Sequence, residues 1–284
     1  MAGWKSGLAT RQALAAAFLA ATVLGGCSNF DPKAPGALDN YSASDIYTRG
    51  EYELQHGKAK DAAFYFSEIE RLYPYSSWAE RGLIMEAFAY HKAADYDNTR
   101  AAAQRYLDNY PTGKDAAYAQ YLLALSYYDQ IDEVGRDQAL TRDALKAFTK
   151  LIETYPDSEY ARAATLKFDL AMDHLAAKEM EVGRYYLKRS IYGAAAARFR
   201  IVVEQFPTTS QTPEALYRLV EAYMALGLTD EAQTAGAILG HNFQSTSWYD
   251  DAYALLTGHG LQARSLGNNW LSAIYRQTVR GAWL

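Results

Sequence analysis

An aromatic residue followed by proline recurs along the chain, and this recurrence constrains the fold more than any other feature. The pairs are Tyr73-Pro74, Tyr110-Pro111, Tyr155-Pro156 and Phe206-Pro207, at intervals of 37, 45 and 51 residues. A residue pattern that returns every 20 to 50 residues is typical of stacked structural repeats. Because proline lacks the backbone N–H and clashes with the preceding turn, each pair predicts the end of a helix.

The residues ahead of Pro207 indicate which repeat this is. Gly183, Tyr186, Ala195 and Phe199 have the spacing G-x2-Y and A-x3-F of the tetratricopeptide repeat, closed by the proline. In such a repeat the small residues let two antiparallel helices approach, and the aromatic ring fills the remaining space. The register predicts repeats at about 44–75, 78–112, 115–157, 176–208 and 212–244, the last one degenerate.

The predicted fold is therefore an all-α tetratricopeptide-repeat superhelix of about five helical hairpins, over residues 44–250. The extra length between repeats three and four is itself helical in pattern, with Ala164, Phe168, Met172 and Leu175 on one face. We expect one long inserted helix there, from about Ser158 to Met180. Stacked hairpins form a curved solenoid, whose concave face is the expected binding surface.

The N-terminus has the features of a secretion signal over residues 1–26. Lys5 and Arg11 precede an apolar run at 13–24, which is shorter than the roughly 20 residues that a membrane-spanning helix needs. The run ends in Leu24-Gly25-Gly26-Cys27, which resembles the lipobox of bacterial lipoproteins. By that resemblance Cys27, the only cysteine, carries the acyl chains, and Ser28 after it favours the outer membrane. Residues 27–43, rich in proline and glycine, are expected to form a flexible lipidated tether.

Composition and motifs argue against nucleic-acid binding and catalysis. The formal net charge is −5, and loss of the signal with its two cations makes it −7, which disfavours a nucleic-acid partner. No HExxH, CxxC or GxSxG motif occurs, and the five histidines are far apart in sequence. An Asp-rich stretch at 129–137 lacks the regular spacing of a calcium loop, so solvation of a loop explains it better. We expect no enzyme, no metal and no cofactor other than the lipid on Cys27.

The tail at 251–284 leaves two interpretations open. After Asp251 it has no acidic residue but carries three arginines together with Trp270, Leu271, Ile274, Tyr275 and Trp283. This composition suits an amphipathic docking helix, and it equally suits a partly disordered terminus.

The lipobox, the short tether, five repeats, the inserted helix and Tyr185-Tyr186 ahead of Ala195 to Pro207 together resemble the BamD/ComL family. The resemblance covers Cys27 to about Gln244. It implies an outer-membrane scaffold on the periplasmic face, a subunit of the β-barrel assembly machinery. The N-terminal repeats would bind the C-terminal targeting strand of unfolded barrel proteins. The C-terminal repeats would bind the periplasmic domains of the central barrel protein (BamA-like) and accessory lipoproteins.

The resemblance also implies roles for particular residues. Arg198, just before Phe199, matches the family's arginine that pairs with an acid of the central barrel protein. For client binding the expected residues are aromatics of the first two repeats, such as Tyr47, Tyr65 and Tyr90, although Tyr90 also suits a core position. Two alternatives stay open at this point. One is a periplasmic tetratricopeptide lipoprotein that coordinates cell-wall or cell-division machinery, and the other is a lipid-anchored hydrolase.

Overall fold

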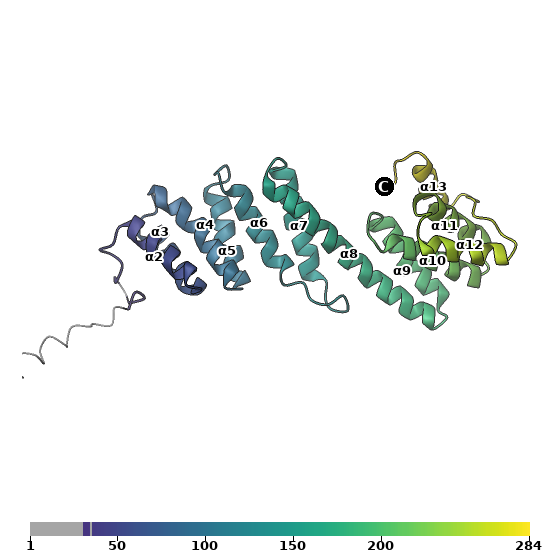
Figure 1. The fold of residues 1–284 in the computed structure, drawn as a ribbon, viewed down its shortest axis with the longest axis horizontal. Coiled ribbons are helices and arrows are strands. Elements are labelled where there is room, and N and C mark those ends of the chain that lie inside the picture. The colour runs from purple at the N-terminus through teal and green to yellow at the C-terminus, as the bar shows by residue number, and fades with distance from the viewer. Residues whose placement is uncertain (1–30, 35) are drawn as a thin grey trace, which may run out of the picture. The chain divides into compact units, whose positions relative to one another are not determined.

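The computed structural model describes residues 31–34 and 36–284, and these residues form twelve helices and no strand (Figure 1). The predicted all-α, tetratricopeptide-like fold is confirmed, with hairpins following one another along the chain. The signal segment and Cys27 lie outside the described residues. No helix in the described part is long and apolar enough to cross a membrane.

The chain divides into two compact units, one up to Gly82 and one from Leu83 onward. The described part of the first unit contains two complete helices and the start of a third. These are α2 (Ala43–Gln55), α3 (Ala59–Leu72) and α4 (Ser77–Lys92), which continues into the second unit. Ser42 begins α2 with a capping box, since its hydroxyl accepts from the Asp45 N–H and the Asp45 side chain accepts from the Ser42 N–H.

A glycine opposite a phenylalanine brings α2 and α3 together. A Cβ atom added to Gly50 would lie 2.7 Å from Cε1 of Phe66, whose side chain is fully buried. The ring of Phe66 therefore occupies the space that any larger residue at position 50 would need. This is the close helix approach that the repeat pattern predicts.

The second unit continues the series of antiparallel helices. From α5 to α11 each helix packs on the next, and the small-to-aromatic contact recurs between Gly183 and Phe199. The helices of this series are α5 (Tyr96–Asn109), α6 (Ala116–Tyr128), α7 (Ala139–Thr154), α8 (Glu159–Lys188), α9 (Tyr192–Gln205), α10 (Thr212–Ala225) and α11 (Thr229–Asn242).

The aromatic residues of the recurring pairs all lie directly after a helix. Tyr73, Tyr110, Tyr155 and Phe206 follow α3, α5, α7 and α9, with φ between −130° and −134° and ψ between 43° and 58°. In each case the backbone N–H donates to the carbonyl four residues earlier. Phe243 after α11 has the same φ although Gln244 replaces the proline. The aromatic residue therefore marks the helix end even where proline is absent.

The inserted helix is longer than the sequence indicated. We expected it to run from about Ser158 to Met180, whereas α8 extends from Glu159 to Lys188 without a break. Ser158 caps its start through a hydrogen bond from the Ala161 N–H. No proline interrupts the helix after Met180, so the insertion and the first helix of the fourth repeat form one rod of 30 residues.

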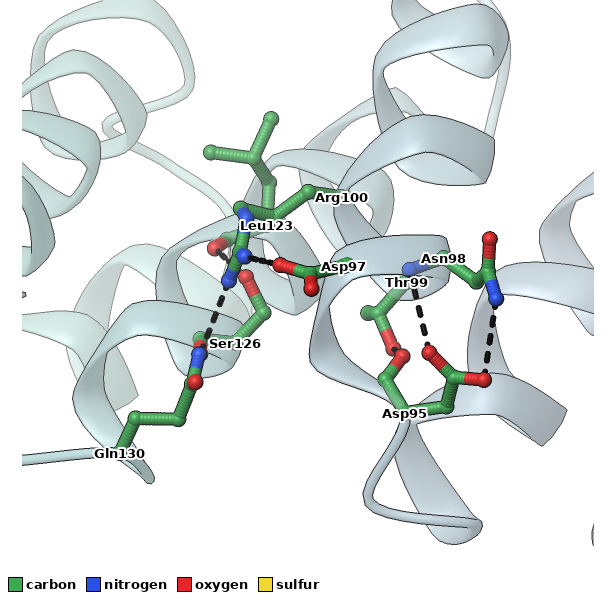
Figure 2. A network of polar contacts seen from close by, with 8 residues as sticks. All are labelled: Asp95, Asp97, Asn98, Thr99, Arg100, Leu123, Ser126 and Gln130. Carbon is green, nitrogen blue, oxygen red and sulfur yellow. Dashed lines mark hydrogen bonds and ion pairs between the residues drawn. The ribbon is translucent and has the colours of Figure 1, made fainter.

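A polar network connects the start of α5 to the end of α6 (Figure 2). The side chain of Asp95 accepts from the Asn98 N–H at the start of α5. On the next turn Arg100 pairs with Asp97, donates to the Ser126 carbonyl and lies over the Tyr127 ring. These contacts supplement the apolar core that joins neighbouring helices.

The residues after α11 form two further helices, α12 (Ser247–Gly258) and α13 (Trp270–Val279). Helix α12 packs on α10 and α11, and α13 packs on α11. Leu271 and Ser272 of α13 are buried, and the Ser272 N–H donates to the Asn269 side chain that caps the helix. The tail thus contains two helices that pack against the last repeat of the same chain.

Candidate functional site

A hollow with a volume of about 780 Å³ lies in the first repeat. We call it the first-repeat groove. One side is formed by α2, with Ile46, Thr48 and Arg49, and the other by α3, with Phe64 and Tyr65. The remaining wall comes from residues just before α2. Cavities of this size bury a small ligand or a few residues of a peptide.

The floor of the groove is apolar, because no helical hairpin precedes α2 in the described part of the chain to cover the outward faces of α2 and α3. Ile46 and Tyr65 are buried beneath it, and the ring of Phe64 is half-buried. In a solenoid the terminal repeat always has one face without a neighbouring repeat. An apolar floor at that face can accept an apolar or aromatic side chain from another molecule.

The rim of the groove carries charges that pair with one another. Glu53 is almost fully buried, and it pairs with Arg49 at 2.6 Å and Lys58 at 3.3 Å. The heads of both cations are more than half exposed, and the Arg49 guanidinium lies 4.9 Å from the centroid of the Tyr52 ring. Since Glu53 holds them at the rim, Arg49 and Lys58 are placed to meet a carboxylate or backbone carbonyls of a bound chain.

Lys33 closes the groove from the segment before α2. Its ammonium lies 2.9 Å from Oδ1 of Asp61, and the hydrogen bond to that carboxylate raises the pKa of Lys33. The same ammonium lies 5.9 Å from the centroid of the Phe64 ring. Both partners of this ion pair are largely exposed, so it positions the segment more than it stabilises the fold.

The three tyrosines that the sequence suggested have different surroundings. Tyr65 lines the groove. Tyr47 instead packs its ring against Phe66 and Trp78, with centroids 5.3 and 5.1 Å apart. Tyr90, in the second unit, is half-buried, and burial raises its pKa. Sequence reasoning missed Arg49 and Glu53, although their spacing of four residues on one helix is a recognisable ion-pair signal.

Arg198 lies on α9, within the second unit. Its guanidinium pairs with the Glu179 carboxylate of α8 at 3.0 Å, and its side chain is 40% exposed. A partner that binds Arg198 must therefore compete with Glu179. The following residue, Phe199, points the other way into the core and is fully buried. Arg198 thus combines a rigid backbone with an accessible charge, which suits a contact between subunits.

The described residues contain no group of three histidine, cysteine or acidic side chains that could hold a metal ion. Two features of the described residues could bind another molecule, namely the groove and the exposed charges of the helices. Both of these suit a polypeptide partner.

Comparison with known proteins gives consistent matches. Residues 39–238 match the model of the YfiO family, described as an outer membrane lipoprotein. The chain is 43% identical over 247 residues to the outer membrane protein assembly factor BamD of Caulobacter vibrioides, covering 87% of this chain and 81% of that protein. It is 38% identical over 250 residues to BamD of Rickettsia prowazekii, covering 87% and 97%. BamD of Pasteurella multocida is 30% identical over 208 residues, covering 70% and 80%.

Proposed function

The chain belongs to the YfiO family of outer membrane lipoproteins, which includes the BamD assembly factors, and from this we propose how its parts serve barrel assembly. The protein is an assembly factor of the barrel assembly machinery and is not an enzyme. It works at the outer membrane, and the expected lipid attachment is Cys27, at the end of the lipobox. Family membership decides against the cell-division scaffold and the hydrolase.

We propose that the first-repeat groove receives the C-terminal strand of unfolded barrel proteins. The observation that supports this role is the hollow of about 780 Å³ with an apolar floor, whose lining includes three cations, among them Arg49 and Lys58, beside four acidic residues. A strand that ends in an aromatic residue can place its ring on the floor beside Phe64. Its terminal carboxylate then lies within reach of Arg49 or Lys58, where charge-assisted hydrogen bonds are strong.

For the second unit we propose that Arg198 contacts a periplasmic domain of the central barrel protein, and that neighbouring helices hold accessory lipoproteins. The support is the family resemblance together with a 40% exposed guanidinium held by Glu179. An acid of the partner replaces or shares Glu179 as the ion-pair partner. No bond is made or broken, because the role is to hold the client and the partner in one place.

The groove assignment is tested by binding of a labelled synthetic peptide that ends in a barrel protein's C-terminal strand. Phe64→Ala removes part of the apolar floor and should weaken binding of the peptide about tenfold or more, since a buried aromatic side chain contributes about 1.5–3 kcal/mol. Tyr75→Ala is the matched control, because Tyr75 is fully exposed in the same unit and does not line the groove. Equal affinities for wild type and both variants would refute the assignment.

A further inference from the structure

The residues just before α2 are folded onto the first repeat. We call residues 31–34 and 36–42 the N-terminal strap. Its anchor is Leu38, whose side chain is only 4% exposed. Ion pairs join Lys33 to Asp61 and, at 3.6 Å, Asp39 to Arg71 of α3. These contacts involve residues in the range 27–43, which was expected from the sequence to form a flexible tether.

Hydrogen bonds within the strap and from the repeat fix its path. Within the strap, each of four backbone N–H groups donates a hydrogen bond to the carbonyl three residues earlier, at 3.0 to 3.2 Å. The donors are Ala34, Ala37, Asp39 and Tyr41. The Tyr73 hydroxyl, at the end of α3, donates to the Tyr41 carbonyl at 2.5 Å. The strap therefore has a defined backbone course along α3.

The strap is also a wall of the first-repeat groove. Asp31, Pro32, Lys33, Leu38 and Tyr41 all line it. Any force that moves the strap therefore changes the shape of the groove. Only three residues separate this wall, at Asp31, from the expected lipid attachment at Cys27.

The covalent chain sets how far the groove can lie from the lipid. Four residue steps separate Cys27 from Asp31, and a chain spans at most about 3.3–3.6 Å per residue, so this distance is at most about 14 Å. Asp31, the first residue of the groove wall, therefore lies within about 14 Å of the acyl attachment. With the strap released, the sixteen steps from Cys27 to Ala43 could span about 55 Å.

We propose that the N-terminal strap holds the first-repeat groove at the surface of the outer membrane. The lipid end of the chain and the wall of the groove form one continuous short connection, so the groove opens beside the lipid headgroups. This placement rests on acylation of Cys27. Together with the proposed function, it means that a client strand is bound at the bilayer into which the barrel inserts.

The test measures the distance of the groove from the bilayer without any client. Thr48 is exposed and lines the groove, and lipidation consumes the thiol of Cys27, so Thr48→Cys provides a single site for a fluorophore. The full-length lipidated protein is placed in phosphatidylethanolamine–phosphatidylglycerol vesicles with and without a headgroup-linked short-range quencher. Mass spectrometry establishes the acyl chains on Cys27.

Three variants accompany this protein. Leu38→Asp releases the strap by placing a charge at its buried anchor, and Asn40→Asp is the matched control that adds the same charge at an exposed position. A Gly-Ser spacer of about 30 residues, inserted between Asn29 and Phe30, adds an r.m.s. distance of about 30 Å without touching the strap. Circular dichroism checks that each variant is folded.

The proposal predicts strong quenching for wild type and Asn40→Asp, and at least a twofold loss of quenching for Leu38→Asp and for the spacer. If Leu38→Asp fails to fold, the spacer alone decides. Quenching in wild type as weak as in the spacer variant, or absence of acyl chains on Cys27, would overturn it. Because no client is present, a failure of the peptide-binding test does not affect this result.

Discussion

The contact between Gly183 and Phe199 gives the sharpest test of the repeat packing. A Cβ atom added to Gly183 would overlap Cε1 of Phe199 and lie 2.8 Å from Cδ1 and Cζ. The ring is fully buried and surrounded by the core of the second unit, so it has no open space to move into. Gly183→Ala should therefore overpack the crossing of α8 and α9.

The size of the effect follows from two opposing contributions. Overpacking a well-packed core costs about 1–3 kcal/mol. Alanine in place of glycine inside a helix stabilises by about 1 kcal/mol. Gly193 on α9 separates the two, because it is exposed and a Cβ there meets nothing within 4 Å. Gly193→Ala should raise the free energy of unfolding. The free energy of unfolding of Gly183→Ala should be about 1–3 kcal/mol lower than that of Gly193→Ala.

Urea unfolding, monitored by circular dichroism, measures the free energy of unfolding of both variants. Phe199→Leu alone should destabilise, but in the double variant the smaller side chain makes room for the new methyl group. The double variant should then be about 0.5–3 kcal/mol more stable than the sum of the two single effects predicts. If Gly183→Ala stabilises as much as Gly193→Ala, the close approach of the helices does not exist and the repeat register is wrong.

Three further outcomes are expected. Arg198→Glu places a second acid beside Glu179 and should abolish co-purification of the central barrel protein at physiological salt. The free energy of unfolding should change by less than about 1 kcal/mol, because the lost ion pair is partly exposed. Retained co-purification would exclude the proposed role. Burial, followed by the neighbouring Tyr160 and Tyr121, raises the pKa of Tyr118 to about 12, so the folded chain retains this proton where the unfolded chain loses it and stability should fall as pH rises above 10. In an ultraviolet titration, Tyr118→Phe should lower the amplitude of tyrosinate formation near pH 12 by one tyrosine, and an unchanged amplitude in that variant would contradict the assignment. Leu271→Asp should detach α13 from α11 and speed tryptic cleavage at Arg264 and Arg276, whereas a cleavage rate equal to wild type would show that Leu271 does not hold the helix.

Sequence predicted the parts of the fold that depend on local chemistry. A helix ends where an aromatic residue and a proline follow, and the Gly183–Phe199 spacing specified a contact that the structure contains. The length of α8 was underestimated because the tetratricopeptide register suggested a new helix near residue 176. No residue in the chain actually enforces a break there, so the helix continues to Lys188.

The features that sequence did not reveal depend on contacts between distant residues. The proline and glycine content before Ala43 indicates irregular backbone, but it does not indicate that Leu38 is buried on the first repeat. Likewise, nothing near Arg198 identifies Glu179, nineteen residues earlier on another helix, as its partner. Arg49, Glu53 and Lys58 are close in sequence, yet their common position at the rim of a groove appears only when α2 and α3 pack.

The central claim is that the first-repeat groove binds unfolded barrel proteins at the outer membrane. The most direct measurement is photo-cross-linking in living cells from an unnatural amino acid at Thr48 inside the groove, with one at the exposed Gly193 as the control. We predict adducts between position 48 and newly made barrel proteins, which disappear once synthesis of those proteins stops, and none of these adducts at position 193. Cells that assemble barrel proteins normally but give no such adduct at position 48 would contradict the claim.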